Sequence, residues 1–199
     1  MTSLKRRFPV KPGMTCHEKF LYYKRMKRIE DYIISVPDFP KPGILFRDIT
    51  GILSDADGLK LTLEAFYKML ENVEFDVVVG LEARGFLFGV SIAEHFHKPF
   101  VPERKKGKLP RETVDVEYDL EYGKACMEIH KDAIKPGQRV LIVDDLLATG
   151  GTAKAAAALV EKLGGKVELF AFVIELFDLH GREALKGYRV ESLTRFPGH

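Results

Sequence analysis

The segment that most restricts how this chain can fold is VLIVDDLLATGGT, at residues 140–152. It begins with aliphatic residues and no polar interruption, a pattern typical of a strand buried on both faces of a parallel sheet. Asp144 and Asp145 follow at the predicted C-terminal end of this strand, where open α/β sheets bind their ligands. A loop of small residues then leads into an alanine-rich stretch, residues 153–163, which predicts a helix. The segment therefore predicts one strand, one binding loop and one helix of an α/β fold.

The loop in this segment is suited to a single phosphate group. Small side chains let main-chain N–H groups close around an anion, two threonines add hydroxyl donors, and the following helix directs its N-terminus at the same place. The segment contains neither GxxxxGK[ST] nor GxGxxG after a strand. Vicinal hydroxyls or a magnesium-bound group would suit the two carboxylates. We interpret the segment as a ribose 5-phosphate site made by Asp144, Asp145, Ala148, Thr149, Gly150, Gly151 and Thr152. The alternative is an ordinary strand, turn and helix with two capping aspartates.

The remainder of the chain alternates between helical and strand patterns. Three prolines at positions 37, 40 and 42 predict a rigid entry loop. Alternation at residues 114–118 and 125–129 predicts an antiparallel pair that carries a mobile lid. Helices are predicted at residues 61–72, 85–97 and 179–185, and strands at residues 75–79, 166–174 and 189–193. Strands that alternate with helices indicate an α/β fold with a mostly parallel sheet flanked by helices.

Composition places the chain among soluble single-domain proteins. Its 199 residues suit one domain, with 46% hydrophobic and 30% charged residues. No apolar stretch is long enough for a membrane span, and the N-terminus lacks a signal-peptide core, so we expect a cytoplasmic protein. Cys16 and Cys126 are too few for a disulfide framework, and we interpret both as reduced thiols.

The N-terminal segment is strongly basic, with nine Lys or Arg residues against two Glu in residues 1–30. We expect residues 1–18 to be a flexible basic extension. Apolar residues at a spacing of three or four predict an amphipathic helix over residues 19–34. One interpretation is an arm that binds nucleic acid or a partner. The other, which we favour, is a solvated tail feeding a helix that packs on the domain or on a neighbouring subunit.

Several motifs, in one order, resemble the type I phosphoribosyltransferases. They are VPDFPKPGILFRDIT (36–50), GLEARGFLFG (80–89), RKKGKLPRET (104–113), YDLEYGKACMEIHKDAIKPGQRV (118–140) and the segment at 140–152, whose LLATGGT ending resembles the adenine-specific branch. The resemblance covers residues 31–199. It implies the type I phosphoribosyltransferase fold, with a small N-terminal hood over residues 19–50 and a mobile lid. It also implies transfer of the phosphoribosyl group from phosphoribosyl pyrophosphate (PRPP) to adenine, which gives AMP and pyrophosphate in purine salvage.

The resemblance also assigns residues to the pyrophosphate. Arg84 follows a predicted buried strand directly, so its guanidinium would lie at the ligand edge of the sheet and engage two phosphate oxygens. In many family members a cis peptide joins the dipeptide that matches Glu82–Ala83. Read without the resemblance, the lysines of residues 105–108 are more simply a solvated basic loop. The implied pyrophosphate-binding set is Glu82, Ala83, Arg84, Lys105 and Lys108.

The base and the proton transfer are assigned in the same way. Phe46 offers a face for purine stacking, and the resemblance gives the adenine edge to main-chain groups of Leu45 and Arg47. Glu121 would handle the proton that adenine loses, and Tyr122 resembles the lid tyrosine that covers the reacting ribose. With Arg84, these two form the predicted catalytic set. From local sequence alone, Phe46 would be a core residue and Glu121–Tyr122 a pair at a strand edge.

The resemblance implies Mg²⁺ as the cofactor, held mainly through PRPP and water, with Asp144 or Asp145 as the protein ligands to consider. It suggests a homodimer, and no nucleic-acid partner is expected. Two alternatives remain. One is a PRPP-sensing transcription regulator that does no chemistry, although residues 19–34 offer only one helix where a helix-turn-helix domain needs more. The other is an enzyme for hypoxanthine, guanine or xanthine.

Overall fold

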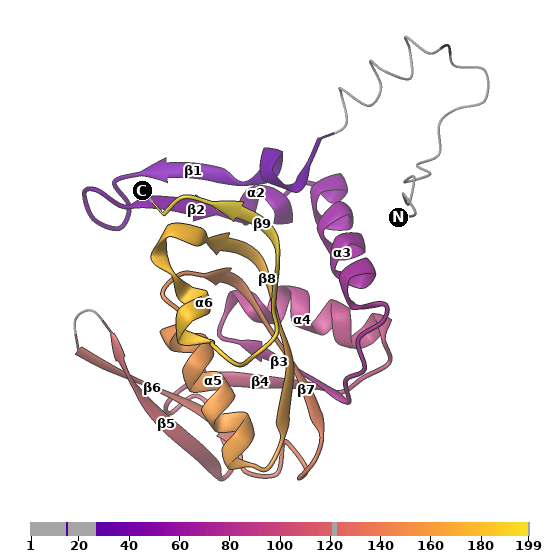
Figure 1. The fold of residues 1–199 in the computed structure, drawn as a ribbon, viewed down its shortest axis with the longest axis vertical. Coiled ribbons are helices and arrows are strands. Elements are labelled where there is room, and N and C mark those ends of the chain that lie inside the picture. The colour runs from indigo at the N-terminus through magenta and orange to yellow at the C-terminus, as the bar shows by residue number, and fades with distance from the viewer. Residues whose placement is uncertain (1–14, 16–26, 121–122, 199) are drawn as a thin grey trace.

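The computed structural model describes Thr15, residues 27–120 and residues 123–198. Its centre is a seven-stranded sheet with the order β5-β6-β4-β3-β7-β8-β9 (Figure 1). The five strands from β4 to β9 in this order run parallel, whereas β6 is antiparallel to β4, and β5 to β6. This confirms the predicted α/β fold. The strands are β3 (Val77–Leu81), β4 (Phe100–Lys105), β5 (Thr113–Leu120), β6 (Gly123–His130), β7 (Arg139–Leu147), β8 (Lys166–Leu176) and β9 (Val190–Phe196).

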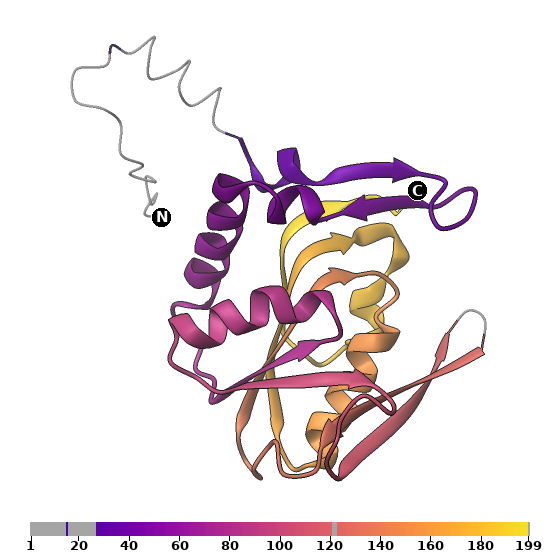
Figure 2. The same cartoon turned by 180° about the vertical axis from the view of Figure 1, so that it is seen from behind.

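Helices cover both faces of the sheet and bury its aliphatic side chains. On one face lies α5 (Gly151–Lys162), whose Ala156 and Val160 join a core cluster with side chains of β3, β6 and β7. On the other face lie α3 (Ala56–Leu70) and α4 (Arg84–His95) (Figure 2). Their side chains Phe66 and Phe88 are completely buried. Two apolar layers around a sheet explain why its central strands read as uninterrupted aliphatic runs.

A small N-terminal hairpin lies across one end of the sheet, beside the end of β9 (Figure 1). A hydrogen bond from Arg47 Nη2 to the main-chain oxygen of Pro197, at 3.0 Å, joins it to the C-terminal residues. The predicted entry loop, with Pro40 and Pro42, connects its two strands. The elements before α3 are η1 (Ile29–Tyr32), β1 (Ile34–Pro37), β2 (Leu45–Asp48) and α2 (Thr50–Leu53), and those between β8 and β9 are η2 (Phe177–Leu179) and α6 (Gly181–Ala184).

The predicted helix over residues 19–34 is wrong in its described part. Residues 29–32 form a single 3₁₀ turn, and strand β1 begins at Ile34. The apolar residues Ile29 and Tyr32 are buried three positions apart, a spacing that a 3₁₀ turn satisfies as well as an α-helix. The following Ile-Ile-Ser-Val run is rich in β-branched residues, which favour a strand. Residues 19–26, and the predicted extension at residues 1–18 apart from Thr15, lie outside the described residues.

Element boundaries differ by a few residues elsewhere. Helix α3 begins five residues earlier than predicted, because Asp55 caps it by accepting the N–H groups of Asp57 and Gly58 at 2.9 and 3.1 Å. Strand β7 continues to Leu147, since β8 pairs with it that far. The two aspartates therefore lie inside the last part of the strand instead of after it. Among the described residues, no helix is long and apolar enough to cross a membrane.

Candidate active site

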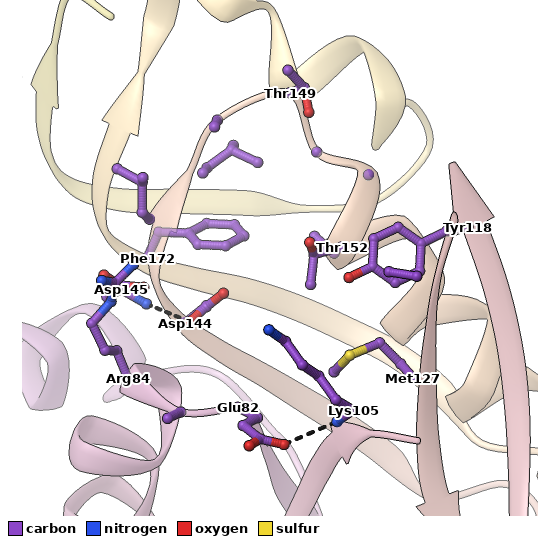
Figure 3. Close-up of a pocket in the computed structure, with 18 of the residues that line it drawn as sticks. Glu82, Arg84, Lys105, Tyr118, Met127, Asp144, Asp145, Thr149, Thr152 and Phe172 are labelled. Atoms are coloured by element: carbon purple, nitrogen blue, oxygen red, sulfur yellow. Dashed lines mark hydrogen bonds and ion pairs between the residues drawn. The ribbon is translucent and has the colours of Figure 1, made fainter. Parts of the chain in front are cut away.

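A pocket of about 630 Å³ opens where β7 passes into α5, and its volume falls in the range of small-molecule sites. Its wall combines segments that are far apart in the sequence (Figure 3). Every residue of the predicted ribose 5-phosphate site lines it, together with Glu82, Ala83, Arg84 and Lys105. The structure thus brings the predicted phosphate loop and most of the predicted pyrophosphate residues to one cavity.

The conformation of the predicted phosphate loop depends on Gly150, the residue before α5. Gly150 has φ 84°, in the left-handed region that favours glycine. A Cβ there would lie 2.6 Å from the main-chain oxygen of Gly181 and 2.9 Å from Cβ of Ala184. Because a side chain does not fit, the chain can turn tightly and α5 can begin at Gly151 with its free N–H groups at the pocket.

The carboxylates of the pocket, on β7, lie close to a cation at the start of α4. Asp145 Oδ2 lies 2.6 Å from Arg84 Nε, and Asp144 Oδ1 accepts the N–H of Asp145 at 2.8 Å. Burial, and next the charge of Asp145, raise the pKa of Asp144 well above its ordinary value. Burial also raises the pKa of Asp145, although the Arg84 guanidinium opposes this. The pair therefore favours ligands that bring compensating donors or positive charge.

At the other end of the pocket, the Glu82–Ala83 peptide bond is cis, as the family resemblance implied. Lys105 points into the pocket (Figure 3). Lys108 differs from the prediction, because its side chain is not among the pocket-lining residues. Its main chain instead accepts from Arg104 and donates to Glu128.

The predicted base-binding residues Leu45, Phe46 and Arg47 lie on β2 and do not line the pocket itself. Phe46 is nevertheless close, since the Arg84 guanidinium carbon lies 5.6 Å from the centre of its ring. Arg47 turns away, toward Ser35, Pro197 and the ring of Phe196. In the described hairpin, β2 pairs only with β1, so alternate main-chain groups of β2 remain on its open side.

The sequence analysis missed several residues of the pocket wall. Phe172 lines it because β8 places this residue directly opposite Asp144 of β7. Tyr118 and Met127 contribute from β5 and β6. Strand pairing brings these side chains to the site, and no local pattern assigns them a role in it. The predicted catalytic residues Glu121 and Tyr122, between β5 and β6, lie outside the described residues.

The carboxylates of the pocket are oxygen donors of the kind that suits a magnesium ion. Within the part of the chain that the structure describes, no three His, Cys, Asp or Glu side chains group as ligands. Since Asp145 is already paired with Arg84, Asp144 is the carboxylate whose chemistry suits a hard cation here.

The fold and this pocket define a protein that binds a phosphorylated sugar at the end of a parallel sheet. The phosphoribosyl transferase domain family matches residues 55–195, and the chain belongs to this family. Within it, the chain belongs to the adenine phosphoribosyltransferases. It is 54% identical over 173 residues to the adenine phosphoribosyltransferase of Lachnoclostridium phytofermentans, covering 87% of this chain and 99% of that protein.

Solved structures agree. The adenine phosphoribosyltransferase of Thermoanaerobacter pseudethanolicus superposes with a TM-score of 0.83 at 54% identity, covering 84% of this chain and 98% of that one. The Saccharomyces cerevisiae enzyme, complexed with adenine and an imino-altritol bisphosphate, gives a TM-score of 0.77 at 42% identity, covering 81% and 94%. The similarity therefore extends over nearly the whole of these relatives.

Proposed function

We propose that this chain transfers the 5-phosphoribosyl group of PRPP to adenine in the pocket described above, giving AMP and pyrophosphate. The observation that carries the proposal is the placement of a phosphate loop and two carboxylates opposite Arg84 and Lys105 in one cavity. Such a cavity offers separate subsites for the two phosphorylated ends of PRPP. Membership of the adenine phosphoribosyltransferases supports the same substrates.

Each group of residues in the pocket would have a different role in the reaction. The loop of residues 148–152 would hold the 5-phosphate, and Asp144 and Asp145 the ribose hydroxyls. Arg84 and Lys105 would neutralise the pyrophosphate as it leaves with the electron pair of the broken C1–oxygen bond. Lys108 is assigned to the same anion, reaching it by a movement of its side chain. Mg²⁺ would add positive charge at the pyrophosphate, held mainly through PRPP and water with Asp144 or Asp145.

Adenine would bind against Phe46, with its edge on main-chain groups of Leu45 and Arg47. The open side of β2 supports this assignment, because unpaired main-chain donors and acceptors can match the N6 and N1 positions of adenine. As N9 bonds to C1 of the ribose, Glu121 would accept the N9 proton, and Tyr122 would help to exclude water from the reacting centre.

The protein is also proposed to be a cytoplasmic homodimer. Leu87 and Val90 on α4 are 46% and 51% exposed, unusual fractions for two aliphatic side chains of one helix. A second copy packing on α4 would bury them. This moves the proposed interface from residues 19–34, whose described part is no α-helix, to the helix that begins at Arg84.

A panel of bases tests the proposed activity. The full chain is incubated with PRPP, Mg²⁺ and, separately, adenine, hypoxanthine, guanine and xanthine, and nucleotide formation is followed. We expect AMP from adenine and little product from the other bases. No product with any base would contradict the proposal and favour a protein that senses PRPP.

A further inference from the structure

The basic loop that follows β4, residues 106–112, has no regular structure, although it continues directly from Lys105 in the pocket. Gly107 in this loop has φ 84°. A loop of this kind leaves main-chain N–H groups without strand partners, and they need other acceptors if the loop is to keep one conformation. The main-chain oxygen of Cys126 accepts the N–H of Lys106 at 3.0 Å, and the other acceptors at this loop and its start are two carboxylates.

Glu128 of β6 is the first of them. Its Oε1 accepts the N–H groups of Lys108 and Leu109 at 2.8 and 2.9 Å, and its Oε2 accepts the hydroxyl of Thr113 at 3.2 Å. The residue is only 4% exposed. Burial is the largest effect on the pKa of Glu128 and would raise it, but the N–H groups of Leu109, Lys108 and Gly107 with the Thr113 hydroxyl together keep it below its ordinary value. The N–H groups of the loop therefore surround the carboxylate of Glu128, as the N–H groups of a main-chain nest surround a bound anion.

The second acceptor is Glu82, at the end of β3. Arg104 donates to both of its oxygens at 3.2 Å through Nε and Nη2, and the N–H of Lys105 donates to Oε2 at 2.9 Å. The remaining arm of Arg104, Nη1, donates to the main-chain oxygen of Lys108 at 3.2 Å. This network ties the basic loop to the Glu82–Ala83 segment that forms the adjoining pocket wall.

The carboxylates of Glu82 and Glu128 thus accept hydrogen bonds without pairing with the charge of a lysine. Among the described residues, Glu82 and Glu128 accept main-chain N–H groups, a hydroxyl and a guanidinium, and neither forms an ion pair with a lysine ammonium group. An acidic residue paired with Lys105 would compete with an incoming anion. Fixing the loop through its main chain orders it and leaves the ammonium group available to the pocket, which reduces the ordering needed on binding.

We propose that Glu128 is a positioning residue that holds the loop of residues 106–112, and with it Lys105, in place to receive the pyrophosphate group of PRPP. The Arg104–Glu82 pair anchors the start of the same loop. This inference rests on the proposed function, because it concerns the pyrophosphate end of the proposed PRPP site. Glu128 itself does not line the pocket, so it acts through the loop and not on the substrate.

Titration calorimetry on the full chain tests this with two ligands. PRPP with Mg²⁺ occupies the pyrophosphate end, whereas AMP carries the 5-phosphate and the base but no pyrophosphate. We expect Glu128→Ala to weaken PRPP binding by about 10- to 100-fold, because its N–H bonds to a charged acceptor are lost. Glu128→Gln keeps an oxygen acceptor and should weaken it less, by about 3- to 10-fold. Both variants should bind AMP within about twofold of the wild type, since AMP does not reach the loop.

The matched control is Glu112→Gln, at the end of the same loop, where the side chain is 84% exposed and, within the described residues, forms an ion pair with Lys131. It should bind both ligands as the wild type does. Steady-state kinetics add a second readout: the KM for PRPP should rise while the KM for adenine stays constant. Because Glu128→Gln preserves the shape of the side chain, the test remains informative if Glu128→Ala does not fold.

Two results would overturn the proposal: unchanged PRPP affinity in folded Glu128 variants, or an equal loss of PRPP and AMP affinity. Failure of the proposed function has a different signature. In that case the wild type itself would bind neither PRPP nor AMP, and the assignment of this loop to pyrophosphate would fall with it.

Discussion

Two glutamates on neighbouring strands of this sheet are both buried, and yet their pKa values are shifted in opposite directions. Glu128 on β6 is 4% exposed and Glu103 on β4 is 0% exposed. Glu128 accepts three hydrogen bonds, and its pKa lies below the ordinary value despite its burial. Neither oxygen of Glu103 has a hydrogen-bond partner among the described residues, and burial raises its pKa to about 8. Burial acts to raise both pKa values, and the hydrogen-bond donors that reach Glu128 but not Glu103 account for the opposite directions of the two shifts.

The direction of each side chain explains the difference. Arg104 pairs with Glu128 across β4 and β6, so these two share a face of the sheet, the face that the basic loop crosses. Glu103, one residue before Arg104, points to the opposite face, because side chains alternate along a strand. There its partner in the neighbouring strand is Leu81, in the apolar layer under α5. No donor from the described residues reaches either oxygen of Glu103 there.

The largest effect is expected on removing the ionised carboxylate. Glu128→Leu keeps much of the volume but leaves the N–H groups of Lys108 and Leu109 without their acceptor. We expect the free energy of unfolding to fall by about 4 kcal/mol at pH 7. Urea unfolding monitored by circular dichroism measures it. A loss near zero would mean that water replaces the carboxylate readily and that the two glutamates are energetically alike.

The opposite sign is expected for the neutral carboxyl. In Glu103→Leu, an apolar side chain joins Leu81 in the layer under α5, and no ionisable group has to be buried. In the wild type, ionisation of Glu103 lowers the free energy of the unfolded chain at pH 8. The variant lacks this ionisable group, so its free energy of unfolding should exceed that of the wild type by about 3 kcal/mol at pH 8. The same urea experiment compares the two proteins. Destabilisation would show that Glu103 makes a stabilising contact in solution.

The sequence analysis predicted neither of these environments. Aliphatic runs and small-residue loops are local patterns, which is why the parallel sheet, the turn of small residues between β7 and α5 and the placement of Arg84 after a buried strand could be predicted. The Asp145–Arg84 pair and the network around Glu128 depend on strand order and register, which join residues far apart in the chain. Glu103 precedes a run of basic residues, so its neighbours in the sequence suggest an exposed side chain. It points inward because side chains alternate between the two faces along β4.

The pH dependence of stability isolates Glu103. Its pKa in the folded protein, about 8, exceeds the ordinary value of 4.5, so the folded state holds the proton more tightly than the unfolded state. Its contribution to stability is therefore complete below about pH 4.5 and is lost progressively as the pH rises to about 8. Glu103→Gln lacks this dependence. Relative to the wild type, we expect it to gain about 2 kcal/mol between about pH 5.5 and pH 7, measured by urea unfolding at each pH. A constant difference across this range would show that Glu103 is ionised in the folded protein.

The smallest effect should come from weakening the donor set of Glu128 by a single group. Thr113→Val removes the hydroxyl that donates to Oε2 at 3.2 Å and leaves the two main-chain donors in place. Because valine suits a strand, the change should destabilise the protein by only about 0.5 to 1 kcal/mol at pH 7. Glu128 has a lowered pKa in the folded state, so its stabilisation is present above the ordinary pKa and disappears as the pH falls through the folded value. The effect of Thr113→Val should therefore be smaller at a pH low enough to protonate Glu128 in the folded protein than at pH 7. If the loss were equal at both pH values, the hydroxyl would be stabilising the strand and not the charge of Glu128. The hydrogen bond from Thr113 would then not contribute to the difference between the pKa values of Glu128 and Glu103.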